Sequence, residues 1–186
     1  MQSLSPSHLP PVFYNLRKDT LSQEHLTEDA AYEFLMTFSG HEAVDGLKAI
    51  WSKLDPETAN RVLISTWCRE PRPYRHYDFW VAALPRFPVS DNEAALSALP
   101  DTLTIYRGGD MDSAAEGFSW TLSRRIAEDF ARLENNNIGS SRYAREYPEL
   151  VTATIPKSAV SLHITGRKEE EIVLHPVNWP RSYRSE

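Results

Sequence analysis

The sequence predicts an α+β protein, in which an N-terminal helical region is followed by a mixed sheet. Between residues 28 and 67, apolar residues recur every three or four positions, which is the spacing of amphipathic helices. From Thr102 onward, apolar residues alternate with polar ones in short runs, which is the spacing of half-buried strands. We therefore expect a helical region over 1–100 that packs on a core over 101–186, the two forming one compact unit.

Length and composition indicate a folded domain that has no strongly basic region. The 186 residues can bury a substantial core, and the net charge of −6 provides no basic domain for attracting nucleic acid over long distances. Binding of nucleic acid in a local basic groove stays an open interpretation. The single cysteine, Cys68, cannot form an internal disulfide, and the chain has neither a signal-peptide pattern nor an apolar run that could span a bilayer. We expect no membrane contact and a cytoplasmic location, including the cytoplasm of a target cell into which the protein is delivered.

The first half predicts three helices after an irregular start. Residues 1–24 contain three prolines and little periodicity. A helix over 28–38 is capped by Thr27, and Gly40 stands where a left-handed residue ends helices. The third helix begins at Asp55-Pro56, an N-cap followed by proline at the first helical position. The apolar positions expected in the core are Ala31, Phe34, Leu35, Phe38, Val44, Leu47, Ile50, Trp51, Leu54, Ala59, Val62, Leu63 and Trp67.

Residues 68–80 interleave basic and aromatic side chains. Such alternation can bind phosphates and stack on bases. It is more typical of a proline-stiffened surface loop whose aromatic rings cover the neighbouring helices, and both interpretations stay open. A polar loop over 134–149 is long for a compact domain, and loops of this length are often functional.

The second half predicts short strands and two helices. A capping box over 90–93 begins a helix that runs to Leu99. Leu103 and Ile105 lie in a strand that ends at Arg107-Gly108-Gly109, where the arginine can reach a phosphate and the glycines let a ligand approach the backbone. The other predicted elements are strands over 117–121, 150–155, 161–164 and 171–175, and a helix over 124–133 capped by Ser123.

Three adjacent acids, Glu169-Glu170-Glu171, precede the last apolar run. Strand spacing would place Glu169 and Glu171 on one face, with Cα atoms roughly 6.5–7 Å apart, and Glu170 on the other. Adjacent carboxylates repel one another and resist burial. Taken alone, the run is typical of a solvated turn that leads into a strand.

Three motifs occur in an order that points to a family. They are Tyr106-Arg107-Gly108, then Phe118-Ser119-Trp120-Thr121 with its following helix, then Glu169 to Leu174. Together they resemble the arginine–serine–glutamate class of mono-ADP-ribosyltransferases, which contains clostridial binary-toxin enzymes and vertebrate ecto-ADP-ribosyltransferases. The resemblance covers about the last 80 residues. It implies two small packed sheets with NAD, the co-substrate, in the cleft between them.

The resemblance also implies a role for each matching residue. Arg107 would bind the NAD phosphates or the adjacent ribose, and the Gly108 backbone would bind the nicotinamide carboxamide. Ser119 would hold the catalytic glutamate and the nicotinamide ribose, while Thr121 would support that strand. Trp120 stands beside the nicotinamide pocket, where the family commonly has a hydroxyl residue, and this departure puts its contribution in doubt.

Of the acids, Glu171 would be the catalytic glutamate, and Glu169 would lie on the side of the acceptor. An acidic pair at this place is seen in arginine-modifying members, so Glu169 favours arginine or another guanidine-like or amine acceptor. The candidates for contact with the acceptor are Arg72, Tyr74, Arg75 and Tyr143.

The chemistry of these groups is compatible with the resemblance. Cleavage of the bond between nicotinamide and ribose releases a neutral group from a cationic one, so no general acid is needed. A carboxylate held against the ribose stabilises the positive charge that develops there, as in sugar-cleaving enzymes. A second carboxylate could take a proton from the incoming nucleophile. The six histidines show no metal-ligand spacing, and no P-loop or dinucleotide fingerprint occurs, so we expect no metal.

Three classes of function stay open. The first is an ADP-ribosyltransferase, a toxin or a phage or bacterial effector, acting on protein in preference to nucleic acid. The second is an NAD glycohydrolase, in which water replaces the acceptor and the same residues serve. The third is a non-catalytic interaction module that keeps the fold; retention of Arg107, Ser119 and Glu171 argues against it.

Overall fold

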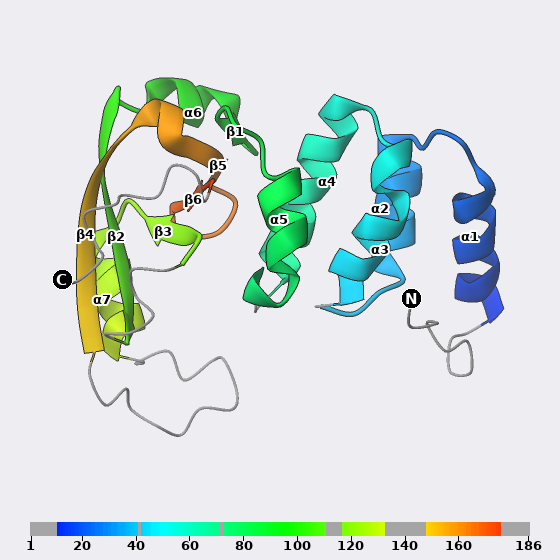
Figure 1. Cartoon of the computed structure of the whole chain (residues 1–186), viewed down its shortest axis with the longest axis horizontal. Coiled ribbons are helices and arrows are strands. Elements are labelled where there is room, and N and C mark those ends of the chain that lie inside the picture. The colour runs from blue at the N-terminus through cyan, green and yellow to red at the C-terminus, as the bar shows by residue number, and fades with distance from the viewer. Residues whose placement is uncertain (1–10, 41, 71–72, 111–116, 133–147, 176–186) are drawn as a thin grey trace. The chain divides into compact units, whose positions relative to one another are not determined.

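The computed structural model describes residues 11–40, 42–70, 73–110, 117–132 and 148–175 (Figure 1). It is a mixed α+β protein, as predicted. The chain forms two compact units, Met1–Ala83 and Leu84–Glu186. The division thus falls before residue 84, whereas the sequence predicted one after residue 100. No helix in the described ranges is long and apolar enough to cross a bilayer.

The first unit is helical, and its start differs from the prediction. Helix α1 covers Pro11–Ser22, where the sequence predicted an irregular segment. The prediction was wrong because Pro11 begins the helix, at the position where proline is tolerated, and does not interrupt it. The other elements of this unit are α2 (Glu28–Met36), α3 (Glu42–Ile50), η2 (Trp51–Lys53), α4 (Pro56–Arg69), η3 (Pro73–His76) and α5 (Tyr77–Ala83).

The predicted helix starts are confirmed, and one predicted helix end is wrong. Thr27 accepts a hydrogen bond from the Ala30 amide at 3.3 Å, and Asp55 accepts bonds from the first turn of α4. Gly40 does not adopt a positive φ, so it is not the left-handed residue expected there. Helix α2 ends earlier, at Thr37, whose hydroxyl donates to the Phe34 carbonyl at 2.7 Å and so satisfies a terminal acceptor.

The core of the first unit consists of the apolar positions that the helical period predicted. Their side chains lie on the facing sides of α2, α3 and α4, and Trp67 packs edge-on against Trp80 with ring centroids 5.0 Å apart. Trp51 and Leu54 are half-buried. The fully or nearly fully buried members are Ala31, Phe34, Leu35, Val44, Leu47, Ile50, Val62, Leu63 and Trp67. Trp80, which the helical period did not include, is also fully buried.

The described residues of 68–80 are mostly helical, so the prediction of a loop is wrong for them. Trp80 and Ala83 are three positions apart and both buried, and α5 forms because a helix brings this spacing to one face. Two basic side chains of the stretch act inside the unit. Arg69 donates to the Leu35 carbonyl at 3.1 Å and to the Phe38 carbonyl at 2.6 Å, at the end of α2.

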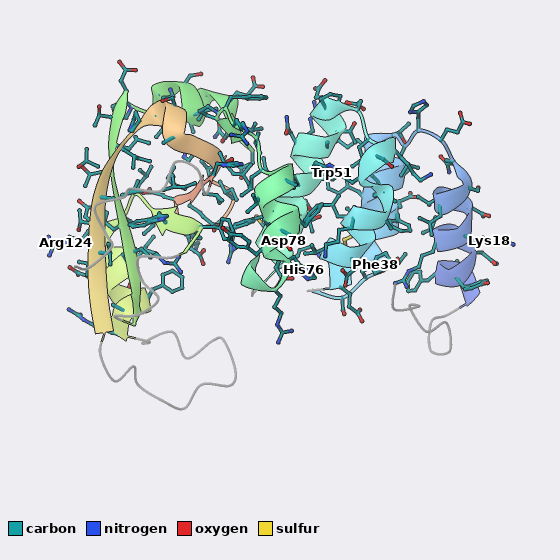
Figure 2. The ribbon with its side chains drawn as sticks, in the orientation of Figure 1. Lys18, Phe38, Trp51, His76, Asp78 and Arg124 are labelled. Carbon is teal, nitrogen blue, oxygen red and sulfur yellow. The ribbon has the colours of Figure 1, made fainter. Side chains whose placement is uncertain are left out.

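The second such side chain is His76, labelled in Figure 2. Its Nδ1 lies 2.9 Å from Lys48 Nζ, and its Nε2 lies 3.8 Å from a carboxylate oxygen of the buried Glu70. Arg69 and His76 therefore stabilise the helical unit, and the phosphate-binding interpretation loses two of its four basic groups.

The described strands of the second unit form one six-stranded sheet in the order β1-β5-β6-β3-β2-β4. Strand β1 is parallel to β5, and all other pairs are antiparallel. The sheet contains β1 (Val89–Ser90), β2 (Thr102–Asp110), β3 (Ser119–Thr121), β4 (Pro148–Pro156), β5 (Val160–Ile164) and β6 (Glu171–Leu174). The helices are α6 (Glu93–Ala98), α7 (Arg124–Arg132) and the 3₁₀ turn η5 (Lys157–Ala159).

The expectation of two small packed sheets is corrected by the position of β3. This short strand pairs with β2 at Thr121 and with β6 along its whole length, so it joins the two halves edge to edge. The apolar core of the unit includes Leu103, Ile105, Trp120, Val151, Ala153, Ile155, Val160, Ile172 and Leu174.

Two element ends in this unit also differ from the prediction. Strand β2 runs through Gly108 and Gly109 to Asp110 because it pairs with β4 along nine residues. Helix α6 is capped by Asn92, whose side chain accepts from the Ala95 amide at 3.1 Å, and not by Ser90 of the predicted capping box. Ser90 instead donates to the His163 carbonyl at 2.7 Å, which ties β1 to β5.

Candidate active site

Glu171 and Ser119 form a hydrogen-bonded pair inside the sheet. Glu171 is the first residue of β6, opposite Thr121 on β3 and Ile164 on β5. Its side chain is only 4 % exposed, and the Ser119 hydroxyl donates to Glu171 Oε1 at 2.6 Å. Burial of a carboxylate is costly, and a hydrogen bond to the charged oxygen offsets part of that cost. The contact inferred from the family resemblance is therefore present.

Arg107 lies beside this pair. Its Nη1 donates a short hydrogen bond to the Ser119 carbonyl. The guanidinium lies directly over Gly117, where an added Cβ would come within 1.9 Å of Arg107 Cζ. A side chain at position 117 would require the guanidinium to move. The sequence analysis singled out Arg107 but not Gly117. The one signal that could have identified Gly117 is its position, two residues before Ser119.

The acids before β6 do not follow strand spacing. Glu170 has a φ of 45°, in the left-handed region, and β6 begins only at Glu171. The prediction that Glu169 and Glu171 share a strand face is therefore wrong, because Glu169 lies in the preceding turn. Both carboxylates instead reach Arg167, whose Nη2 lies 3.3 Å from Glu169 and whose Nη1 lies 3.6 Å from Glu171. The sequence analysis missed Arg167.

The end of this turn is held by β3. The Thr121 hydroxyl donates to the Glu169 carbonyl at 2.5 Å, and the Leu122 amide donates to the Glu170 carbonyl at 3.2 Å. The same hydroxyl accepts from the Ser123 amide at 3.0 Å. Thr121 therefore joins β3, the start of α7 and the turn over residues 165–170, which we call the acid turn.

The start of the turn is held by Asp91, which the sequence had placed in a capping box. Its carboxylate accepts from the Thr165 amide and the Gly166 amide, each at 2.8 Å, and from the Thr165 hydroxyl at 3.0 Å. Partial burial raises the pKa of Asp91, but these hydrogen bonds outweigh that effect and the net pKa is lowered. No sequence signal joins two segments more than 70 residues apart.

Gly108 and Trp120 both pack against other parts of the second unit. A Cβ on Gly108 would lie 1.9 Å from the Ala127 carbonyl oxygen, so the backbone of α7 packs directly on β2. Trp120 is buried in the core, and its indole donates to the Gly117 carbonyl at 3.0 Å. The inferred contacts of these two residues with nicotinamide stay predictions.

The contacts inferred for the acceptor candidates stay predictions. Arg75 is exposed in η3, in the first unit, and Tyr74 belongs to the same turn. Arg72 and Tyr143 lie outside the described residues. Within the described ranges, no group of three or more histidine, cysteine, aspartate or glutamate side chains could hold a metal ion.

Comparison with protein-family models, curated proteins and solved structures gives no match to this chain. The family resemblance therefore depends on the three motifs and on the convergence of Arg107, Ser119 and Glu171.

Proposed function

We propose that this chain is a mono-ADP-ribosyltransferase that uses NAD as co-substrate and modifies a macromolecular acceptor. The observation that carries the proposal is the hydrogen bond from Ser119 to the buried carboxylate of Glu171, with Arg107 bound to the carbonyl of the same serine. Three polar groups from β2, β3 and β6, as far apart as residues 107 and 171, meet in one place. A sheet needs none of them for stability, whereas the reaction needs all three.

The proposed reaction uses Glu171 to stabilise charge. Loss of neutral nicotinamide leaves positive charge on the ribose, and a fixed carboxylate stabilises it more strongly in the transition state than in the bound substrate. The hydrogen bond from Ser119 fixes one carboxylate oxygen in advance, so little reorganisation accompanies the reaction. Arg107 supplies the cation that the NAD phosphates or the adjacent ribose require.

The acceptor that fits best is the guanidinium of an arginine on a protein. A guanidinium is a planar fork that matches carboxylates, and Arg167 already bridges Glu169 and Glu171 in this way. In the proposed transfer, the acceptor nitrogen bonds to ribose C1′, the bond from C1′ to nicotinamide breaks, and the electron pair leaves with nicotinamide. Glu169 takes the proton from the acceptor nitrogen.

The proposed setting is a cytoplasm, either that of the cell that makes the protein or that of a target cell. NAD and protein acceptors are available there, and a lone cysteine is compatible with a reducing compartment. The proposal includes a toxin or a phage or bacterial effector.

The test is incubation with labelled NAD and lysates of candidate target cells, comparing the wild type with Glu171→Gln. The substitution keeps the shape and removes the charge, so transfer should fall by about 10²–10³-fold or more. Glu128→Gln is the matched control, because this acid pairs with Arg124 on the exposed side of α7.

Each outcome of this test points to a different class of function. Label on protein supports the proposal, label on nucleic acid changes the acceptor, and free ADP-ribose alone indicates a glycohydrolase. Near-normal transfer by folded Glu171→Gln would reject the catalytic role, and no turnover of NAD with any lysate would favour a non-catalytic module.

A further inference from the structure

The turn that carries Glu169 is fastened at both ends by side chains from distant parts of the second unit. At its start, the Asp91 carboxylate accepts four hydrogen-bond contacts, three from Thr165 and one from Gly166, all between 2.8 and 3.1 Å. A Cβ on Gly166 would lie 3.0 Å from Asp91 Oδ2, so the carboxylate and the turn are closely packed. At its end, Thr121 binds the Glu169 carbonyl.

The two acids depend on these fastenings to different degrees. Glu171 lies in β6 and pairs on both edges, with Thr121 on one side and Ile164 on the other. Glu169 lies in the turn, two residues before the strand and next to the left-handed Glu170. Ladder pairing therefore fixes Glu171 independently of Asp91, whereas the position of Glu169 follows that of the turn.

We propose that Asp91 is a positioning residue that holds the turn so that Glu169 serves the acceptor, and that it thereby favours transfer over hydrolysis of NAD. This inference depends on the proposed function. It assigns to one side chain outside the three motifs the choice between two reactions that share Arg107, Ser119 and Glu171.

The chemistry explains why the two reactions should separate. In transfer, an acceptor nitrogen bonds to ribose C1′ while its proton passes to Glu169, so the place of Glu169 matters. In hydrolysis, a water oxygen bonds to C1′, the bond from C1′ to nicotinamide breaks, and a proton of the water passes to solvent. Water is abundant and needs no oriented base, so this reaction requires Glu171 but tolerates a displaced Glu169.

The experiment measures both products and the mobility of the turn in Asp91→Ala. Transfer of label to agmatine, a small guanidine acceptor, should fall by about tenfold or more, because misplacing a catalytic group by 1 Å can cost about 10²-fold. Release of free ADP-ribose should stay within about twofold of the wild-type rate, which the same argument predicts for an undisturbed Glu171. Amide hydrogen exchange over 165–170 should be faster, with no change in β4.

Graded variants keep the test valid if Asp91→Ala folds poorly. Asp91→Asn keeps an oxygen for Thr165 but turns an amide group towards the Gly166 N–H, so it should give an intermediate ratio of transfer to hydrolysis. Thr165→Val removes only the hydroxyl contact. Asp129→Ala is the control, since this exposed aspartate pairs with Arg125 on α7 and should leave the ratio unchanged.

Two results would overturn the inference: an equal loss of transfer and hydrolysis in Asp91→Ala, or unchanged exchange over 165–170. A wild-type protein that turns over no NAD would instead remove the proposed function and the transfer role of Asp91 with it. Faster exchange in the variant would still establish that Asp91 holds the turn, so the two failures are distinguishable.

Discussion

At the scale of single residues, the most informative group is the buried carboxylate of Glu171. An apolar side chain of similar volume would stabilise the sheet as well or better, because removing a charge from water often costs more than its hydrogen bond and ion pair return, here those with Ser119 and Arg167. A protein that keeps such an acid, with a serine placed to bind it, has given up stability at that point. Buried acids with specific partners are concentrated at functional sites, which is the physical reason for placing the reaction here.

A second single residue, His163, should make the stability of the protein depend on pH. The ring is 3 % exposed on β5, with Nδ1 3.4 Å from the Ser90 hydroxyl. Burial lowers its pKa from 6.5, and Lys157 also lowers it, while Asp91 and Glu170 oppose the shift. The folded protein therefore binds a proton on this ring less readily than the unfolded chain does.

The sign of the effect follows from this difference in proton binding. Above pH 6.5 the ring is neutral in both states, and stability is unaffected. As the pH falls through 6.5 the unfolded chain gains a proton first, so the free energy of unfolding decreases until the folded pKa is passed. Thermal unfolding between pH 7.5 and about 5 should show this decrease in the wild type and a smaller one in His163→Gln. His25→Gln, at an exposed site, is the control; equal slopes for wild type and His163→Gln would contradict the prediction.

At the scale of secondary-structure elements, contact between α7 and β2 shapes the site. Figure 1 shows α7 beside β2, the strand that carries Arg107. The next residue, Gly108, lies against the backbone of α7. The helix can approach this closely because Gly108 has no side chain. The glycine therefore has a packing reason that is independent of any bound nicotinamide.

Gly108→Ala tests this packing. The new Cβ would lie 1.9 Å from the Ala127 carbonyl oxygen and 2.5 Å from the Ala131 amide nitrogen, and backbone must move to admit it. We expect a loss of about 1–3 kcal/mol in the free energy of unfolding, measured by denaturant titration. Gly40→Ala is the control, because its nearest contact would be 3.8 Å and its φ is not positive. Equal stability of the two variants would contradict the close-packing explanation.

Most elements were predictable because their signals are local. The periods of 3.6 and 2 located the helices α2, α3 and α4 and the strands β2 and β6, and the caps Thr27 and Asp55 marked two helix starts. The errors at α1 and α5 have one cause. Prolines near both segments predict a break in the helix, but Pro11 begins α1 and Pro73 begins η3, the 3₁₀ turn that leads into α5.

At the scale of the whole molecule, the chain divides into two units with separate cores. The helical core is built from α2, α3 and α4, and the sheet has its own apolar cluster. Arg107, Ser119, Glu171 and the residues that hold the acid turn all belong to Leu84–Glu186. The proposed chemistry therefore resides in the second unit.

Expression of residues 84–186 alone tests this division. The fragment should fold with a cooperative thermal transition and release ADP-ribose from NAD at a rate within about threefold of the full chain, since all the groups proposed for the reaction belong to this unit. Residues 1–83 alone should be helical by circular dichroism and inactive. A second unit that folds but has lost turnover, while the full chain keeps it, would show that the helical unit contributes to the reaction.

The amino-acid sequence by itself determined the kind and order of the elements other than α1 and α5, and the three polar residues that mark the candidate site. These follow from periodicity, caps and short motifs, which act between neighbours in the chain. Only the tertiary structure decided that the strands form one sheet, that Arg107 lies over Gly117, that Arg167 bridges the two acids, and that Asp91 holds Thr165 and Gly166. Strand pairing and the bonds of Asp91, which lies more than 70 positions from its partners, depend on how all elements pack together, and no local pattern encodes that outcome. Arg167 is close in the chain to both acids, but the turn that brings the three together, with Glu170 in the left-handed region, departs from the strand spacing that the sequence predicted.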